Sequence, residues 1–184
     1  IIPFLPFFAD KYRVNGTIIG LLLSTNAIFS FICGPILSKL SDKYGRKPLL
    51  LISQAGTMIG FLMLAFSNSL LMLFISRIVD GLFGGNFPIA KAVIGDIVPP
   101  KERGKQMANI GVAHVLSSLI GPGLGGFLSD WGILGPGIAA AALSLMTMIL
   151  TYLYLEETLP LIRLKNGKYV PEHIRRYNFL KKKN

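Results

Sequence analysis

Long apolar runs separated by short charged segments dominate the pattern of hydrophobic and polar positions along this chain. Four of these runs, at residues 17–37, 48–66, 107–128 and 133–155, each have close to the roughly 20 residues that a membrane-spanning helix needs. Runs of this length fit neither strands nor half-exposed helices, and backbone groups in a bilayer must hydrogen-bond within their own segment. The pattern therefore predicts an all-α, polytopic membrane helix bundle.

Two further apolar segments differ from these four. Residues 69–98 are longer and carry four ionisable residues, so we expect a tilted span whose charges face the interior of the bundle. Residues 1–9 are too short to cross a bilayer, and they lack the basic start and cleavage site of a signal peptide. We interpret them as part of a truncated first helix, which makes six helices within residues 1–160.

The composition agrees with a membrane protein. Hydrophobic residues make up 52% of the chain and charged residues only 15%, too few to coat a soluble domain. The net charge of +10 could indicate nucleic-acid binding, but the basic residues lie between apolar runs and not on a polar fold. The single cysteine, Cys33, allows no intrachain disulfide. We expect the lipid bilayer as a partner and no nucleic acid.

The distribution of Lys and Arg predicts the orientation. The short segments 38–47 and 99–105 together hold seven of them, whereas the short segments on the other side hold two. Because short loops rich in Lys and Arg stay in the cytoplasm, we place both segments there. Residues 161–184 follow on the same side and predict a basic cytoplasmic linker or tail, either on an anionic membrane surface or solvated. A plasma membrane and an organelle membrane are the two alternatives for its location.

A weak internal repeat relates the ends of the second and fifth predicted helices. Residues 34–37 (GPIL) run on to a Leu-Ser-Asp at 40–42, and residues 121–124 (GPGL) run on to a Leu-Ser-Asp at 128–130. The alignment needs one-residue gaps, so chance is the alternative. The two ends must point to opposite sides, as inverted three-helix repeats predict.

The most specific pattern runs from residue 38 to residue 47 (SKLSDKYGRK). It resembles the loop between helices two and three of the major facilitator superfamily, Gly-x-x-x-Asp-Arg/Lys-x-Gly-Arg/Lys-Arg/Lys. Ser38 replaces the first glycine, and the other five specified positions match: Asp42, Lys43, Gly45, Arg46 and Lys47. The resemblance implies that these five residues form a conformational latch between two transporter halves in the outward-facing state. An ordinary basic loop is the alternative.

The sequence from Arg77 to Gly81 (RIVDG) resembles the Arg-x-x-x-Gly signature of the fourth helix in this family. An arginine at membrane depth costs about 3 kcal/mol or more unless it is paired or hydrated. Asp80 lies on the same helical face, three residues on, so a local ion pair can form. The resemblance links Arg77 to proton coupling, with Asp80 as the carboxylate that exchanges the proton; a purely structural buried pair is the alternative.

The stretch 121–126 (GPGLGG) resembles the Gly-Pro-x-x-Gly-Gly antiporter signature of the fifth helix. Small residues let helices approach backbone to backbone, and proline adds a kink. We therefore expect helix packing at Gly81, Gly121, Pro122, Gly125 and Gly126. Generic small-residue packing would explain the glycines without the rest of the pattern.

Two more segments complete the resemblance. Residues 96–104, with Asp96 and Arg103, look like the cytoplasmic loop between helices four and five, and residues 156–160 (EETLP) look like the ending of the sixth helix. Four motifs thus occur in the family's order within residues 1–160. The resemblance implies the N-terminal six-helix half of a major facilitator fold with inverted three-helix repeats.

Other polar residues give weaker signals. His114 could relay protons, although a lone histidine is more often a packing or hydrogen-bonding residue. Five more could line a substrate path or simply bond between helices: Asn26, Ser30, Gln54, Asn86 and Lys91. No metal-ligand cluster, nucleotide-binding loop or catalytic triad is visible, so we expect no cofactor, no metal and no enzyme.

The function that these observations imply is secondary active transport of small organic solutes by alternating access, with proton-coupled antiport. The partners would be a small-molecule substrate, protons, and the missing second transporter half or another chain. A facilitative uniporter of the same fold and a half-length, non-transporting membrane protein that acts through a partner are the alternatives.

Overall fold

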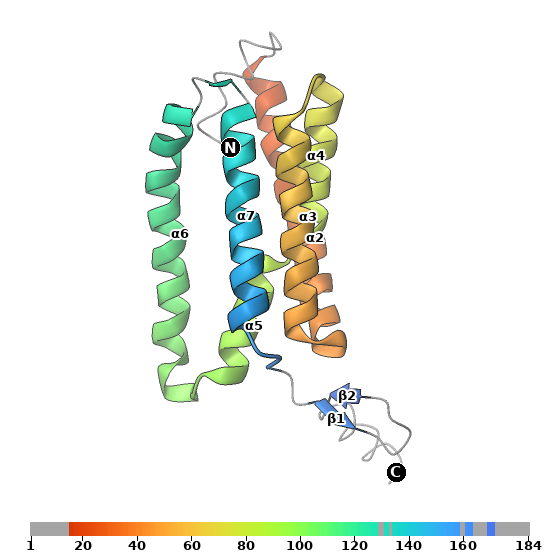
Figure 1. Cartoon of the computed structure of the whole chain (residues 1–184), viewed down its shortest axis with the longest axis vertical. Helices are drawn as coiled ribbons and strands as arrows, with labels where there is room; N and C mark the ends of the chain where they lie inside the picture. The colour runs from red at the N-terminus through yellow and green to blue at the C-terminus, as the bar shows by residue number, and fades with distance from the viewer. Residues whose placement is uncertain (1–14, 129–130, 133, 159–160, 164–168, 172–184) are drawn as a thin grey trace.

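The computed structural model describes residues 15–128, 131–132, 134–158, 161–163 and 169–171. It contains a bundle of long helices with a small β-ribbon below one end (Figure 1). The helices are α2 (Gly16–Tyr44), α3 (Arg46–Ala65), α4 (Leu70–Leu82), α5 (Asn86–Ile97), α6 (Pro100–Leu128) and α7 (Leu134–Tyr154).

Five helical segments of the described chain are long and apolar enough to cross a membrane, with α4 and α5 counted as one span. The prediction of a polytopic helix bundle is confirmed, while α2 and α6 extend beyond the apolar runs 17–37 and 107–128. The predicted remnant of a first helix at residues 1–9 lies outside the described residues.

The distribution of polar and apolar side chains is that of a membrane protein. Phe31 is 82% exposed and Leu119 is 75% exposed, whereas Arg77 is fully buried and is the largest of the completely buried side chains. Large apolar side chains on the outside would be unfavourable in water but suit a hydrocarbon solvent. The buried polar groups therefore lie where the helices contact each other.

The connection between α2 and α3 consists of the single residue Gly45, which corrects the expectation of a ten-residue loop at 38–47. Helix α2 continues to Tyr44 and α3 begins at Arg46. Gly45 has φ +111°, a backbone conformation that L side chains rarely adopt, so glycine allows the reversal in one step. The motif residues before Gly45 are therefore helical.

A short break between Leu82 and Asn86 divides the predicted span 69–98 into α4 and α5. Helix α3 supplies polar partners at this break: the Ser53 hydroxyl donates to the carbonyl of Phe83, and Asn86 Nδ2 donates to Thr57 Oγ1 at 3.2 Å. Backbone groups freed by a broken helix are tolerated inside a membrane when neighbouring helices satisfy them. The continuous apolar run predicts one tilted helix here, and the break is not visible in the hydropathy.

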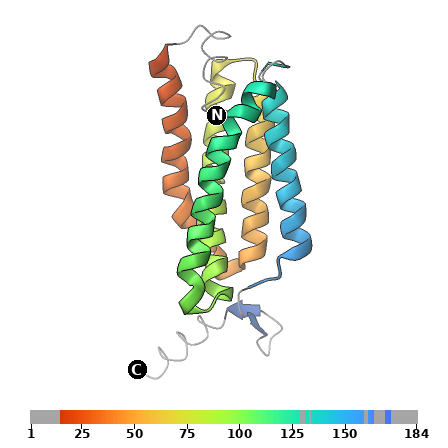
Figure 2. The ribbon, with the colours of Figure 1, turned by 90° about the vertical axis from the view of Figure 1, so that its left-hand side faces the viewer.

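The core of the bundle is formed by α2, α3, α4 and α7, with α3 against both α4 and α7. One buried cluster joins Leu22, Leu64 and Leu73, and a second joins Leu49, Leu50 and Ile89. Helix α6 stands at the outer edge of the bundle, on the left in Figure 1 and in front of the other helices in Figure 2. Few residues of α6 contact α5 or α7.

Beyond α7, strand β1 (Leu161–Arg163) pairs antiparallel with β2 (Tyr169–Pro171), with Ile162 opposite Val170. This ribbon lies below the bundle (Figure 1). The charge pattern predicts only a basic linker or tail here, since three-residue strands leave too short a pattern to recognise.

Candidate functional site

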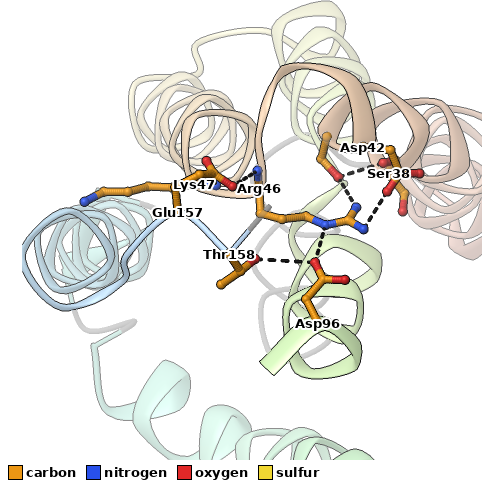
Figure 3. A network of polar contacts seen from close by, with 8 residues as sticks. Ser38, Asp42, Arg46, Lys47, Asp96, Glu157 and Thr158 are labelled. Atoms are coloured by element: carbon orange, nitrogen blue, oxygen red, sulfur yellow. Dashed lines mark hydrogen bonds and ion pairs between the residues drawn. The ribbon is translucent and has the colours of Figure 1, made fainter. Parts of the chain in front are cut away.

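Arg46, the first residue of α3, is the centre of a polar network at one end of the bundle (Figure 3). Its Nη2 atom lies 2.5 Å from Asp42 Oδ1, one turn earlier in the chain, and its Nε atom lies 2.9 Å from Asp96 Oδ2 on α5. Nη1 donates to the fully buried Ser41 hydroxyl at 2.7 Å. The guanidinium thus ties the end of α2 to the end of α5.

Two residues that follow α7 complete this network. Glu157 accepts hydrogen bonds from the backbone N–H groups of Arg46 at 2.8 Å and Lys47 at 3.2 Å. A carboxylate at the first turn of a helix satisfies unpaired N–H groups and interacts favourably with the helix dipole. Thr158 donates to Asp96 Oδ2 at 3.4 Å (Figure 3). Glu157 therefore caps α3 from a segment distant in the sequence.

The other basic residues of the predicted motif lie at the periphery. Lys47 Nζ donates to the carbonyl of Tyr152 at 2.8 Å and lies 5.2 Å from the centre of that tyrosine ring. Lys43 lies above the ring of its neighbour Tyr44 at 5.3 Å. Arg103 Nε donates to the carbonyl of Val98 at 2.9 Å, which joins the end of α5 to the start of α6. The structure thus brings together Asp42, Gly45, Arg46 and Asp96, but not Lys43 or Arg103.

A second polar cluster lies inside the bundle around Arg77 on α4. Arg77 is fully buried, and its Nη1 atom lies 3.1 Å from Asp80 Oδ2; the Asp80 side chain is 14% exposed. Asn26 on α2 joins the pair, because its Nδ2 donates to Asp80 Oδ2 at 3.0 Å and to the Arg77 carbonyl at 3.3 Å. The pair expected from the i, i+3 spacing is therefore present and is shared between two helices.

The other side of the Arg77 guanidinium has fewer hydrogen-bond partners. Its carbon lies 5.7 Å from the centre of the Phe61 ring on α3, a cation–π distance. Its Nη2 atom is buried and has no hydrogen-bond partner among the described residues. A buried charged group with a free donor is costly unless its partners can change. The cluster can therefore gain a hydrogen bond if the pair rearranges.

Of the small residues expected to mediate helix packing, Gly81 lies in a close contact between helices, whereas Gly121 and Gly126 do not. A Cβ atom added at Gly81 would lie 2.7 Å from Phe29 Cβ and 2.9 Å from the Asn26 carbonyl, so α4 lies close against α2 there. In α6, a Cβ added at Gly121 or Gly126 meets no described atom within 4 Å. Gly121, Pro122 and the buried Gly125 instead line an apolar cavity of about 400 Å³ between α6, α3 and α7.

Most of the residues proposed for a substrate path bond between helices. Gln54 Nε2 donates to Thr151 Oγ1 at 3.0 Å, which links α3 to α7, and Asn86 bonds to Thr57 as described above. Asn26 belongs to the Arg77 cluster. Lys91 and His114 are exposed and both lie beside Phe87. Within the described ranges, no three His, Cys, Asp or Glu side chains are grouped so that they could hold a metal ion.

Sequence reasoning missed the role of Glu157 and only partly anticipated that of Asp96. The family resemblance marked both segments, but no local spacing indicates that they converge on Arg46. Their meeting depends on where α5 and α7 end relative to α3.

Comparison with known proteins gives matches over nearly the whole chain. A sequence profile of the Major Facilitator Superfamily matches residues 1–183. The tetracycline resistance protein, class H, of Pasteurella multocida is 37% identical over 161 residues, which are 86% of this chain and 40% of that protein. Multidrug resistance protein 2 of Bacillus subtilis (strain 168) is 28% identical over 182 residues, 98% of this chain and 45% of that protein.

Among solved structures, the crystal structure of the human organic anion transporter MFSD10 (TETRAN) is similar, with a TM-score of 0.72 and 28% sequence identity. The match covers 84% of this chain and 37% of that one. The chain thus spans about two fifths of the length of these relatives.

Proposed function

The chain belongs to the major facilitator superfamily, and from this membership we propose that it forms part of a secondary active transporter that exports small organic solutes in exchange for protons. It is an integral, multi-pass membrane protein, and the similar human protein of known structure is named as an organic anion transporter. Because it spans about 40% of its relatives, a second transporter half or another chain would complete the molecule. Transport would then proceed by rocking of the two halves around a site near the midplane of the membrane.

The buried pair of Arg77 and Asp80 is the observation that carries the proton-coupling proposal. An arginine next to a carboxylate favours its ionised form, so the carboxylate takes up a proton more readily once the ion pair opens. The free Nη2 donor of Arg77 gives the arginine another group with which to bind a new partner once Asp80 is protonated. In this proposal, protonation of Asp80 therefore changes the hydrogen bonds that join α4 to α2.

The Arg46 network supports the proposal of a conformational latch. Its contacts join the ends of α2, α3 and α5 to the residues after α7, so a movement of one of these ends relative to the others would strain or break contacts to Arg46 or Glu157. Asp42, whose side chain is 47% exposed, is the member most open to a further partner. We propose that the second half binds there in one state of the transport cycle.

We place the Arg46 end of the bundle in the cytoplasm, because the basic segments 38–47 and 99–105 both lie at this end. Labelling of a cysteine introduced at Lys101 by a membrane-impermeant maleimide tests this orientation. Labelling in inside-out but not right-side-out vesicles is the expected result.

Transport in proteoliposomes tests the function, with this chain purified together with the second transporter half or other chain that completes it. Tetracycline is a suitable first probe, because one relative is named as a tetracycline resistance protein. With an acidic lumen, we expect uptake of radiolabelled tetracycline against its gradient, together with alkalinisation of the lumen reported by a trapped pH-sensitive dye. The Asp80→Asn protein should lose proton-driven accumulation but retain exchange of unlabelled for labelled solute.

Glu156→Gln is the matched control, because Glu156 is exposed and lies outside both clusters. Undiminished proton-driven accumulation in Asp80→Asn contradicts the coupling proposal. Equilibration of solute without alkalinisation in the unaltered protein indicates a uniporter. Absence of flux with tetracycline and with a panel of cationic and anionic dyes favours a non-transporting protein.

A further inference from the structure

One face of α3 contacts both Asp80 and the break between α4 and α5. The residues on this face are spaced i, i+3, i+4 and i+7, as expected for one side of a helix: Ser53, Gly56, Thr57 and Gly60. A Cβ atom added at Gly60 would lie 2.9 Å from Asp80 Cβ, so α3 and α4 approach closely there. A Cβ added at Gly56 would overlap the ring of Phe83 in the break. The Asp80 carboxylate and the break therefore lie against the same helix.

The backbone of the break is not held by regular helical hydrogen bonds. The N–H of Gly84 donates to the Gly81 carbonyl at 3.0 Å and the N–H of Gly85 donates to the Phe83 carbonyl at 2.7 Å, so neither makes the i to i−4 bond of an α-helix. The Phe83 carbonyl also accepts from the fully buried Ser53 hydroxyl of α3. Segments with few regular backbone bonds open locally more easily than helix interiors. The break therefore depends on side-chain contacts from α3.

Thr57 of α3 lies between Asp80 and the break. Its hydroxyl donates a hydrogen bond to the Asp80 carboxylate, and its Oγ1 atom accepts one from Asn86 Nδ2 at 3.2 Å. Asn86 is the first residue of α5, directly after the break. A threonine hydroxyl has one hydrogen to donate and lone pairs to accept with, so both bonds can exist together. The Thr57 oxygen thus joins the carboxylate of α4 to the first turn of α5.

The groups that face Asp80 from the neighbouring helices are uncharged. Among the described residues, its charged partner is Arg77 on its own helix, at 3.1 Å. From α2 it meets the amide of Asn26, and from α3 the hydroxyl of Thr57. The charged residues of α2 and α3 all lie at positions 39–47, about 15–20 Å along their helices from these two contacts at 1.5 Å per residue. A change in the charge of Asp80 therefore acts on α3 through Thr57.

We propose that Thr57 is a positioning residue that transmits the charge state of Asp80 to the break between α4 and α5. An ionised carboxylate accepts a strong, charge-assisted hydrogen bond, which fixes the Thr57 hydroxyl and keeps its oxygen toward Asn86. A neutral Asp80 side chain accepts a weaker bond, so the contact between Thr57 and Asn86 loosens and the break opens more often. That Asp80 changes charge during transport rests on the proposed function.

Helix α5 gives this link its consequence for the rest of the bundle. It runs from Asn86 at the break to Ile97, and Asp96 in its last turn binds Arg46 Nε at 2.9 Å. A looser break therefore acts on the helix whose other end belongs to the Arg46 network.

Hydrogen exchange at the break tests this link without any transport. The chain is purified together with the second half that completes it and placed in nanodiscs, and mass spectrometry follows amide exchange in peptides that cover residues 83–87. Thr57→Val removes the hydroxyl and should speed exchange there about fivefold, as expected for the loss of one hydrogen bond. Arg77→Met combined with Asp80→Asn makes the pair neutral without leaving an unpaired charge, and it should speed exchange by a similar factor.

The variant that combines all three substitutions distinguishes a link from two separate effects. If Thr57 carries the influence of Asp80, exchange in this triple variant should be no faster than in its parents, because the same contact is already lost in each. Independent effects would multiply to about 25-fold and overturn the proposal. Unchanged exchange in the neutral pair also overturns it, even where transport is coupled to protons. A confirmed link without proton coupling contradicts the proposed function alone.

Two variants and an internal reference make the result specific. Thr57→Ser keeps the hydroxyl and should restore both slow exchange and the response to the neutral pair. Thr147→Val removes an exposed hydroxyl that bonds the Ser144 carbonyl within α7, and it should leave the break unchanged. Peptides of α7 should exchange equally fast in all variants. An equal acceleration in α7 and at the break would show a general loss of stability and overturn the proposal.

Discussion

Glu157 accepts a hydrogen bond of 2.8 Å from the backbone N–H of Arg46, although the two residues are 111 positions apart in the chain. Through this contact the segment after α7 caps the first turn of α3, while the Arg46 side chain binds Asp42 and Asp96. Arg46 thus contacts the segment after α7 through its backbone, and the ends of α2 and α5 through its side chain. The turn at Gly45 makes both connections possible.

Substitution of Glu157 by Ala should destabilise the bundle by about 1–2 kcal/mol, because the first N–H groups of α3 lose their side-chain cap. Unfolding of the purified protein in mixed micelles with increasing dodecyl sulfate measures the change. Glu156→Ala is the control and should stay within about 0.5 kcal/mol, since Glu156 is an exposed residue. Equal effects of the two substitutions would contradict the capping role.

Substitution of Gly45 by Ala should cost about 1–3 kcal/mol, the range for a residue held in a sparsely populated backbone conformation. Its φ of +111° is unfavourable for alanine, and the added Cβ would meet the Glu157 carboxylate. The same unfolding assay measures the loss. The matched control Gly95→Ala has no described atom within 4 Å of the added Cβ and lies in α5, so it should be neutral or stabilising. A neutral Gly45→Ala would show that another residue can make the turn.

Removal of one partner of the buried Arg77–Asp80 pair should be more damaging than removal of both. Asp80→Asn leaves a fully buried guanidinium without its carboxylate and should cost about 3–5 kcal/mol. Arg77→Met combined with Asp80→Asn should recover most of this loss, because no unpaired charge remains. A double-mutant cycle in the unfolding assay measures the coupling between the residues.

Arg103→Met serves as the control for this cycle, since Arg103 is an exposed arginine that contacts only the Val98 carbonyl among the described hydrogen bonds. It should change stability by less than about 1 kcal/mol and add independently to Asp80→Asn. Additive losses for Arg77 and Asp80 would mean that the two residues do not act as a pair.

Close approach of α4 to α2 predicts that Gly81→Ala is destabilising by about 1–3 kcal/mol, the usual cost of overpacking. The added Cβ would lie 2.9 Å from the Asn26 carbonyl, which belongs to the backbone of α2 and cannot rotate away. Gly111→Ala in α6, where no described atom lies within 4 Å, should instead be neutral or stabilising. A larger loss of stability in Gly111→Ala than in Gly81→Ala would contradict the close contact at Gly81.

Much of the helical architecture could be predicted from hydropathy, because a bilayer imposes both the length and the apolar character of each span. The exact element boundaries were less predictable. Helix α2 continues through polar residues to Tyr44, since nothing but the conformation of Gly45 ends it. The break between α4 and α5 was missed for the opposite reason: its sequence remains apolar, and the partners that stabilise it, Ser53 and Thr57, belong to α3.

Within the candidate site, short-range pairs could be predicted and long-range ones could not. The i, i+3 spacing of Arg77 and Asp80 and the i, i+4 spacing of Asp42 and Arg46 place each pair on one helical face. The contribution of Asn26 to the first pair has no comparable signal in the chain, because α2 and α4 meet only in the folded bundle.

The sequence by itself determined the membrane-spanning segments, the basic end of the bundle and the family, since each depends on residue types counted along a continuous stretch. Only the tertiary structure decided that Asp96 and Glu157 converge on Arg46, and that Asn26 of α2 joins the pair of Arg77 and Asp80. These groupings depend on how helices of fixed length are placed against one another, and that placement follows from close packing at residues such as Gly81.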